Sequence, residues 1–231
     1  MSAAKRDVEF LPASDQSLLV YFDTKISLRA HQQVRALLHG LASQPIAPVR
    51  NVHPAYSSVL VDFDPLRIAH ADLETKLRRY IEQLDELELP APREVKIPTC
   101  YGGEFGPDLE ELGRTHGLSA DQVVELHSSV TYTVYFLGFV PGFAYLGKLP
   151  EALVMPRLAT PRRATSPGSV GIADRQTAVY PFATPGGWRL IGRTPISMFQ
   201  PDRENMSLLN VGDRVRFVPI SSAEFAAMQE A

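Results

Sequence analysis

The residues that most clearly suggest chemistry are arginines. Between Pro156 and Arg193 the chain carries six arginines and one acid, Asp174, although its formal net charge is −3. Guanidinium groups bind carboxylates and phosphates through a planar fork of donors. This segment predicts a site for an anionic small molecule or a partner loop, with a solvated basic face as the alternative. The arginines are Arg157, Arg162, Arg163, Arg175, Arg189 and Arg193.

The single tryptophan lies inside this basic segment. In "ATPGGWRLIGRT", Trp188 stands between the flexible Gly186–Gly187 turn and Arg189. A turn backbone, an aromatic ring and arginines together are typical of a small-molecule site. The alternative is that Trp188 fills the core of a barrel.

A second motif has the spacing of a phosphate-binding loop. Gly142, Gly147 and Lys148 fit G-x-x-x-x-G-K, but Leu149 stands where a Ser or Thr would hold magnesium. The interior also carries bulky Phe143 and Tyr145 instead of small residues. We therefore predict a tight, aromatic-lined turn at a strand end. We expect Phe143 or Tyr145 to lie partly exposed at the rim of a concave face, with an arginine of the basic segment beside it.

Other candidates for catalysis are weaker. "PGSVG" has Pro167 where a nucleophile elbow needs Gly, so Ser169 is predicted to begin a strand. Cys100 is predicted to be a small buried hydrophobe. The six histidines lack metal-ligand spacing, so no metal ligands are assigned, with a site formed by distant residues as the alternative. His127, with an ordinary pKa near 6.5, is a candidate proton carrier or a helix-end residue with a structural hydrogen bond.

The bulk properties exclude several classes of protein. The chain of 231 residues is 45% hydrophobic and 21% charged, which is typical of globular domains. No charge bias indicates nucleic acid, no apolar run could span a membrane, and no signal peptide is visible. One cysteine excludes an internal disulfide. We expect a cytoplasmic protein without a nucleic-acid or membrane partner.

The elements that position these residues divide the chain into two domains. Residues 1–90 alternate strand and helix signals, with Ser27 capping a helix over 28–43 and a second helix over 69–87. They predict a small α+β domain with a helix-covered antiparallel sheet. "LPAP" in 87–94 is the expected linker. Residues 91–231 predict short helices over 107–116 and 120–127, the latter capped by Ser119, then short strands between Gly/Pro turns, and a terminal helix.

Taken together, these motifs resemble one family. "GGEFGPDLEEL", "ELHSSVTYTVYFLGFVPGFAYLGKLP", "MPRLATPRRATSPGSVGIADRQTAVYPFATPGGWRLIGRTP" and "VGDRVRFVPI" are similar to the PxpB/KipI family, also called allophanate hydrolase subunit-like proteins. The resemblance covers nearly the whole chain. It implies an α+β N-terminal domain followed by a mostly-β, cyclophilin-like barrel domain. Two stretches depart from the expected pattern, "ATSPGSVGIAD" and "TPGGW", but they keep its turn chemistry.

The resemblance also implies a function. It indicates one subunit of an ATP-dependent 5-oxoprolinase, inactive alone, which opens 5-oxoproline to glutamate with PxpA-type and PxpC-type partners. ATP would act through the complex. The alternatives are a regulator that inhibits a sensor histidine kinase, and an allophanate hydrolase-type or urea carboxylase-related subunit. The candidate catalytic residues are His127 and Arg193. The candidate substrate-binding residues are Phe143, Tyr145, Arg157, Arg162, Gln176, Gly186, Gly187 and Trp188.

Overall fold

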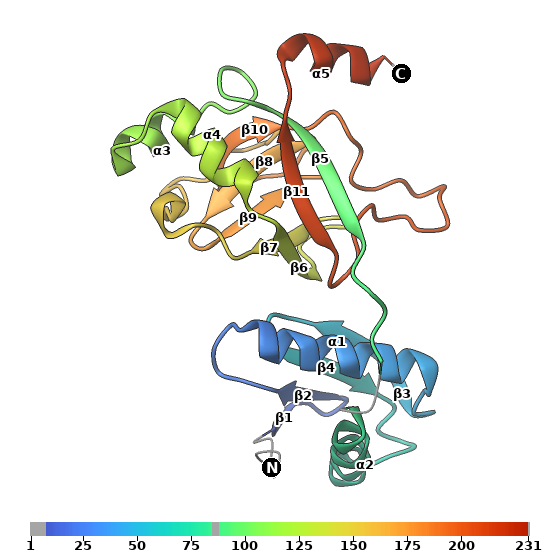
Figure 1. Cartoon of the computed structure of the whole chain (residues 1–231). Helices are drawn as coiled ribbons and strands as arrows, with labels where there is room; N and C mark the ends of the chain where they lie inside the picture. Colours follow the sequence, from blue (N-terminus) through green and yellow to red (C-terminus); the bar gives the residue numbers. More distant parts are fainter. Residues whose placement is uncertain (1–7, 85–87, 231) are drawn as a thin grey trace. The chain divides into compact units, whose positions relative to one another are not determined.

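The chain forms two compact units, Met1–Ala91 and Pro92–Ala231, shown in a computed structural model (Figure 1). Residues 8–84 and 88–230 are described. Among these residues, no helix is long and apolar enough to cross a membrane.

The first unit is an antiparallel sheet with two helices. Its strand order is β1-β2-β4-β3. Buried side chains come from alternate positions of β2 and β4, where Leu18 faces Val61 and Val20 faces Val59. Both helices contribute to the same core, so they cover that face of the sheet. The elements are β1 (Glu9–Ser14), β2 (Ser17–Tyr21), α1 (Leu28–Ser43), β3 (Val49–Pro54), β4 (Ser58–Phe63) and α2 (His70–Glu82).

Local signals account for these helices. Ser27 accepts a hydrogen bond from the Ala30 amide and starts α1 as predicted. The second helix begins where expected but ends at Glu82, earlier than the predicted end at residue 87. Residues 85–87 lie outside the described part of the chain. Leu84 is still buried, so the apolar stripe continues past the last helical residue.

The second unit is a closed seven-stranded barrel of order β10-β5-β11-β6-β7-β9-β8. Most neighbours are antiparallel, but β5 and β11 run parallel. The barrel and the helix-covered sheet confirm the predicted mostly-β and α+β parts; the likeness to cyclophilin stays a prediction. The strands are β5 (Glu94–Tyr101), β6 (Tyr132–Leu137), β7 (Ala144–Gly147), β8 (Ser169–Ala173), β9 (Gln176–Val179), β10 (Arg189–Arg193) and β11 (Arg214–Pro219).

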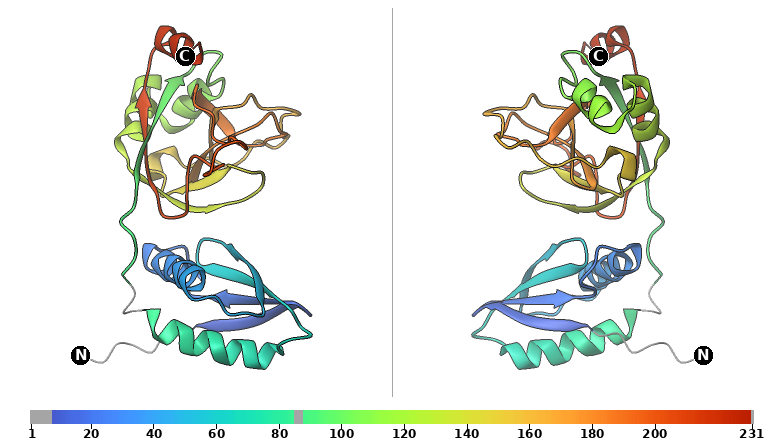
Figure 2. Two further views of the ribbon diagram at one scale, coloured as in Figure 1. Left: turned by 90° about the vertical axis from the view of Figure 1, so that its right-hand side faces the viewer. Right: turned by 90° about the vertical axis from the view of Figure 1, so that its left-hand side faces the viewer.

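Short helices complete the second unit. A capping box of Ser119 and Gln122 starts α4 as predicted, and α4 packs against β11. The loops coloured orange, between β8 and β11, extend from the side of the barrel away from β5 and β11 (Figure 2). The helices are α3 (Leu109–His116), α4 (Ala120–Ser129), the 3-10 helix η2 (Glu151–Leu153) and α5 (Ser222–Gln229).

Strands β8 and β9 carry two different sets of side chains. Val170 pairs with Val179 and Ile172 with Thr177, and the apolar members of these pairs belong to the barrel core. Ala173 of β8, Ala178 of β9 and Tyr180, which follows β9, belong to a separate aromatic cluster. Because successive side chains of a strand point to opposite faces, the core fills the barrel and the aromatic cluster lies on its outer face.

Three of the weaker sequence motifs have ordinary structural roles. Ser169 begins β8 and is buried, and Cys100 is a buried thiol in β5, as expected. The near phosphate-loop is a turn followed by a strand: the Phe143 amide donates to Val140, and β7 starts at Ala144. A strand leaves no cradle of free amides for a phosphate. The prediction of a turn in place of a P-loop is confirmed.

Candidate functional site

The aromatic residues of the outer face form one cluster. We call it the Trp188 cluster; it comprises Phe143, Ala173, Ala178, Tyr180, Trp188 and Leu190, with Val140 and Tyr145 packed against it. Phe143 lies edge-on to Trp188, with ring centroids 5.6 Å apart, and Tyr145 lies 5.9 Å from the same ring. Sequence-distant segments therefore build one aromatic surface.

Burial within this cluster is uneven. Phe143 is 1% exposed, so of the two aromatics expected to be partly exposed, Phe143 or Tyr145, only Tyr145 is. Its ring is covered by Phe139, Tyr145, Tyr180 and Trp188. Phe139 is the exposed aromatic of this turn, at 61%, and it has a left-handed φ of 71°. Tyr145 is half-buried, which leaves part of it accessible to a ligand.

The Gly-Gly turn fits against this surface because it lacks side chains. A Cβ on Gly186 would lie 2.6 Å from the Tyr180 hydroxyl and 2.8 Å from a Thr165 methyl. Any other residue would force this segment away from Tyr180. Gly187 has ordinary clearance, its nearest neighbour being Pro161 at 3.6 Å. Gly186 is therefore the position that requires glycine.

Arg157 lies beside the cluster, which confirms the expected arginine. Its guanidinium carbon is 5.9 Å from the centre of the Trp188 ring. Burial raises the pKa of Tyr145 and of Tyr180, and the charge of Arg157 partly offsets both shifts. Arg157 is exposed and has no ion-pair partner among the residues that the structure describes. It is thus a cation free to bind a ligand anion.

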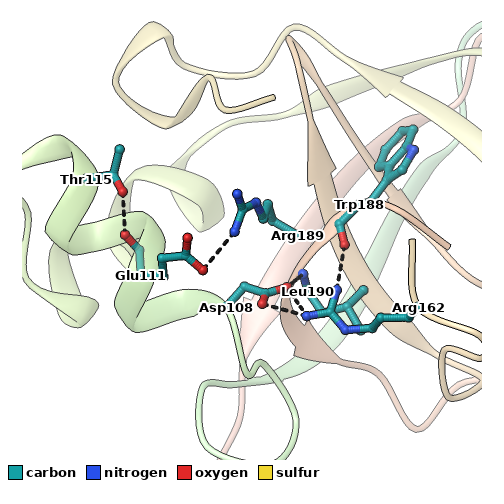
Figure 3. A network of polar contacts seen from close by, with 7 residues as sticks. All are labelled: Asp108, Glu111, Thr115, Arg162, Trp188, Arg189 and Leu190. Atoms are coloured by element: carbon teal, nitrogen blue, oxygen red, sulfur yellow. Dashed lines mark hydrogen bonds and ion pairs between the residues drawn. The ribbon is translucent and has the colours of Figure 1, made fainter. Parts of the chain in front are cut away.

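Arg162 has a different position from Arg157. One of its terminal nitrogens contacts both carboxylate oxygens of Asp108, at 2.6 and 2.8 Å, and the other donates to the Trp188 carbonyl (Figure 3). Since these donors are used within the protein, the structure offers no support for direct substrate binding by Arg162. That role stays a prediction.

Arg193 lies away from the Trp188 cluster. It is the last residue of β10, whereas Trp188 directly precedes that strand. Five residues of strand correspond to roughly 16 Å. Arg193 donates to the Pro167 carbonyl and lies over Phe225 of α5. A catalytic role remains a prediction, but the structure does not bring Arg193 together with Arg157.

His127 projects from α4 into the barrel core. Its Nδ1 lies 2.7 Å from the Tyr101 hydroxyl and its Nε2 lies 3.0 Å from the Thr177 hydroxyl. Thr177 donates to the Gly171 carbonyl, so its oxygen accepts from Nε2–H, and Nδ1 accepts from Tyr101. Burial lowers the pKa of His127 to about 3. The ring is therefore neutral at pH 7, and this geometry fits the structural alternative; proton transfer by His127 stays a prediction.

Gln176 lies at an edge of the Trp188 cluster. It is the first residue of β9, is half-buried, and pairs with Ala173 of the cluster. It lies two residues before Ala178 of the cluster, so the two side chains belong to the same face of β9. Within residues 8–84 and 88–230, no three His, Cys, Asp or Glu residues are grouped so as to hold a metal ion.

Two residues of this region were not among the sequence-based candidates. Tyr180 is 2% exposed, and its hydroxyl is hydrogen-bonded to the Trp188 backbone. Asp108 joins Arg162 to the amide of Leu190. An acid directly after Gly106 and Pro107, ahead of an apolar helix face, is the sequence signal that indicates Asp108.

Comparisons with known proteins agree with this architecture. Residues 8–209 match the family described as carboxyltransferase domain, subdomain C and D. The chain is 44% identical to the 5-oxoprolinase B subunit of Escherichia coli O157:H7, over 89% of this chain and 93% of that one. It is 38% identical to the 5-oxoprolinase B subunit of Bacillus subtilis, over 94% of both.

A solved structure and a distant relative place the same region in longer chains. The crystal structure of TTHA0988 matches with a TM-score of 0.79 and 34% identity, over 90% of this chain but 40% of that one. The urea amidolyase of Saccharomyces cerevisiae is 23% identical over 96% of this chain and 14% of its own length.

Proposed function

Since the chain belongs to the carboxyltransferase domain family, subdomains C and D, and within it to the B subunits of 5-oxoprolinase, we propose that it is a subunit of an ATP-dependent 5-oxoprolinase. The observation that carries this proposal is the identity of 38–44% over about nine-tenths of both chains. The complex would add water across the lactam bond of 5-oxoproline and release glutamate.

The Trp188 cluster supports the same substrate class. 5-Oxoproline has a small ring, one carboxylate and one amide. Arg157 supplies one cation without an ion-pair partner among the described residues. The half-buried Tyr145 supplies aromatic surface, with the buried Trp188 ring packed against it. Gln176 supplies an amide that can pair with the lactam. A monocarboxylate ring compound matches this set of groups better than a polyanion.

The chemistry explains why the chain would work with partners. A lactam is a stable amide, and phosphorylation of its oxygen by ATP would make the carbonyl reactive toward water. The segment of this chain with phosphate-loop spacing, residues 142–148, folds as a turn and a strand and not as a phosphate-binding loop. We therefore assign ATP binding to partner subunits of PxpA and PxpC type, with this chain holding the ring compound.

Reconstitution tests this proposal. The purified chain alone should show no ATP hydrolysis dependent on 5-oxoproline, and addition of both partner subunits should produce it together with glutamate. Turnover by the single chain would contradict the subunit role. A complex that forms but leaves 5-oxoproline unchanged would contradict the substrate, and allophanate should then be tested in its place.

A further inference from the structure

Asp108 occupies the N-cap of α3 without capping it. Aspartate is favoured at this position because its side chain usually accepts from amides of its own helix, yet Asp108 makes no such bond. Its carboxylate is instead directed at Arg162 and at the Leu190 amide, which lies 2.6 Å away. The side chain is 8% exposed. The Asp108 carboxylate therefore stabilises β10 and the loop that carries Arg162, and not its own helix (Figure 3).

Arg162 connects Asp108 to the segment that carries Arg157. The backbones of Arg162 and Gly186 exchange two hydrogen bonds, of 2.9 and 3.1 Å. Four residues earlier, the Leu158 amide donates to the Gly187 carbonyl at 2.7 Å. The loop 158–162 is thus tied at both ends to the Gly-Gly turn, and Arg157 directly precedes it.

We propose that Asp108 is a positioning residue, which acts through Arg162 to hold Arg157 and Trp188 in their relative places. The backbone already ties the loop to the Gly-Gly turn and Asp108 to Leu190. The Arg162 guanidinium adds the side-chain link between these two pairs, because it contacts both the Asp108 carboxylate and the Trp188 carbonyl. Without the carboxylate, the guanidinium loses its charged partner and the loop loses its tie to α3. Arg157 directly precedes the loop, so a shift of the loop moves the main chain from which its guanidinium reaches the Trp188 ring.

The inference rests on the proposed function for its catalytic consequence, but not for its structural one. A displacement of about 1 Å at a binding group can cost on the order of 100-fold in rate. A change at Asp108 should therefore reproduce a change at Arg157. The chain also contains a built-in reporter, because Trp188 is its only tryptophan.

The experiment compares Asp108→Asn, Arg157→Ala and a matched control, Glu111→Gln. Glu111 lies on α3 and pairs with Arg189 of β10 at 2.7 Å, so it joins the same two elements without touching the loop (Figure 3). Arg162→Lys is the second variant, because it keeps the charge but cannot reach Asp108 and the Trp188 carbonyl together. Folding of each variant is checked by circular dichroism.

The first measurement is quenching of Trp188 fluorescence in the chain alone, by iodide and by neutral acrylamide. A charge about 6 Å away should enrich iodide about threefold. The ratio of iodide to acrylamide quenching should fall in Arg157→Ala and to a similar extent in Asp108→Asn or Arg162→Lys, and stay unchanged in Glu111→Gln. Folded Asp108→Asn and Arg162→Lys proteins with the wild-type ratio would overturn the inference. If Asp108→Asn does not fold, Arg162→Lys decides alone.

The second measurement uses the reconstituted complex. KM for 5-oxoproline should rise about 10-fold in Arg157→Ala and in Asp108→Asn with little change in kcat, and the double variant should be no worse than Arg157→Ala. Additive losses would overturn the inference. A wild-type complex that does not consume 5-oxoproline would defeat the proposed function, and the fluorescence result would still decide the role of Asp108.

Discussion

Polar groups on the inner face of the barrel wall have hydrogen-bond partners within the protein, whereas Arg157 on the outer face has no ion-pair partner among the described residues. Inside, His127 is surrounded by Tyr101, Tyr132 and Phe217, and both ring nitrogens have a partner. Outside, Arg157 lies beside an equally aromatic cluster and has no ion-pair partner among the described residues. Aromatic surroundings are common to both, so they do not distinguish a structural site from a binding site.

His127 and Arg157 differ in how many of their hydrogen-bonding groups remain free for a ligand. His127 hydrogen-bonds the hydroxyls of Tyr101 and Thr177, and Thr177 in turn donates to the Gly171 carbonyl. The ring therefore fixes α4 to the core. The donors of Arg157 face solvent and can exchange water for a ligand at little cost. Unused bonding capacity, more than residue type, is the reason why we propose the region of Arg157, and not His127, as the binding site.

The largest effect that tests this comparison concerns Phe143, which lies under the outer cluster. Phe143→Ala should lower the free energy of unfolding by about 3–5 kcal/mol, because it leaves a cavity between four other rings. Denaturant melts of the barrel transition measure it. A loss below about 1 kcal/mol would mean that the outer cluster is loosely packed and unlike the interior.

The next effect is the pH dependence that His127 produces. The pKa of His127 is about 3 in the folded chain and about 6.5 in the unfolded chain. Between these two pH values, the imidazole is protonated in the unfolded chain but neutral in the folded chain. Stability is complete above about pH 6.5 and falls as the pH drops toward 3, by about 2 kcal/mol between pH 7 and 5.

The matched variant for this pH effect is His127→Gln, which cannot titrate. Urea melts at pH 7 and pH 5 should show a smaller loss of stability on acidification for the variant than for the wild type, although its stability at pH 7 is lower. Equal losses in the two proteins would show that His127 is protonated in the fold and that the interior is not closed.

A smaller effect is expected at the outer cation. Arg157→Ala should lower kcat/KM of the reconstituted complex about 10-fold, or about 1.4 kcal/mol, with no change in the unfolding midpoint. Arg193→Ala provides the contrast, because the Pro167 and α5 contacts of Arg193 predict a loss of stability with a weaker kinetic effect. The reverse pattern would move the binding site to the other end of β10.

The smallest effect is expected at Phe139, the exposed aromatic of the turn. Its left-handed φ of 71° is unfavourable for a bulky residue. Phe139→Gly should therefore change the free energy of unfolding by less than about 1 kcal/mol, because relief of strain offsets lost contact with Phe143. A loss as large as that of Phe143→Ala would place Phe139 in the core. Parallel melts of the two variants make the comparison.

The sequence predicted the features that depend on local signals. Ser27 and Ser119 each start a helix because their hydroxyls accept hydrogen bonds from nearby amides. The predicted C-terminal helix begins in the same way, after Ser221. The barrel strands follow from short β-rich runs between Gly/Pro turns. The unsuitability of the Gly142–Lys148 stretch for phosphate was also readable, since a missing hydroxyl and bulky residues are local facts.

The features that could not be predicted from the sequence depend on contacts between residues far apart in the chain. Phe143 is buried because Tyr180 and Trp188 fold over it, and nothing near it in sequence reports this. Arg162 is engaged by Asp108, a residue 54 positions away. Arg157 and Arg193 looked alike as members of one basic segment, and only the course of β10 separates them.

The parallel pairing of β5 with β11 has a consequence for how the barrel is made. All of β11 pairs with the first six residues of β5. Arg93, just before β5, pairs with Asp213, just before β11 and 120 residues later. During synthesis, β5 leaves the ribosome long before its neighbour exists and presents an unpaired edge to other chains. Such long-range closure slows folding. We expect the barrel to be the part of this chain that depends most on chaperones while it is being translated.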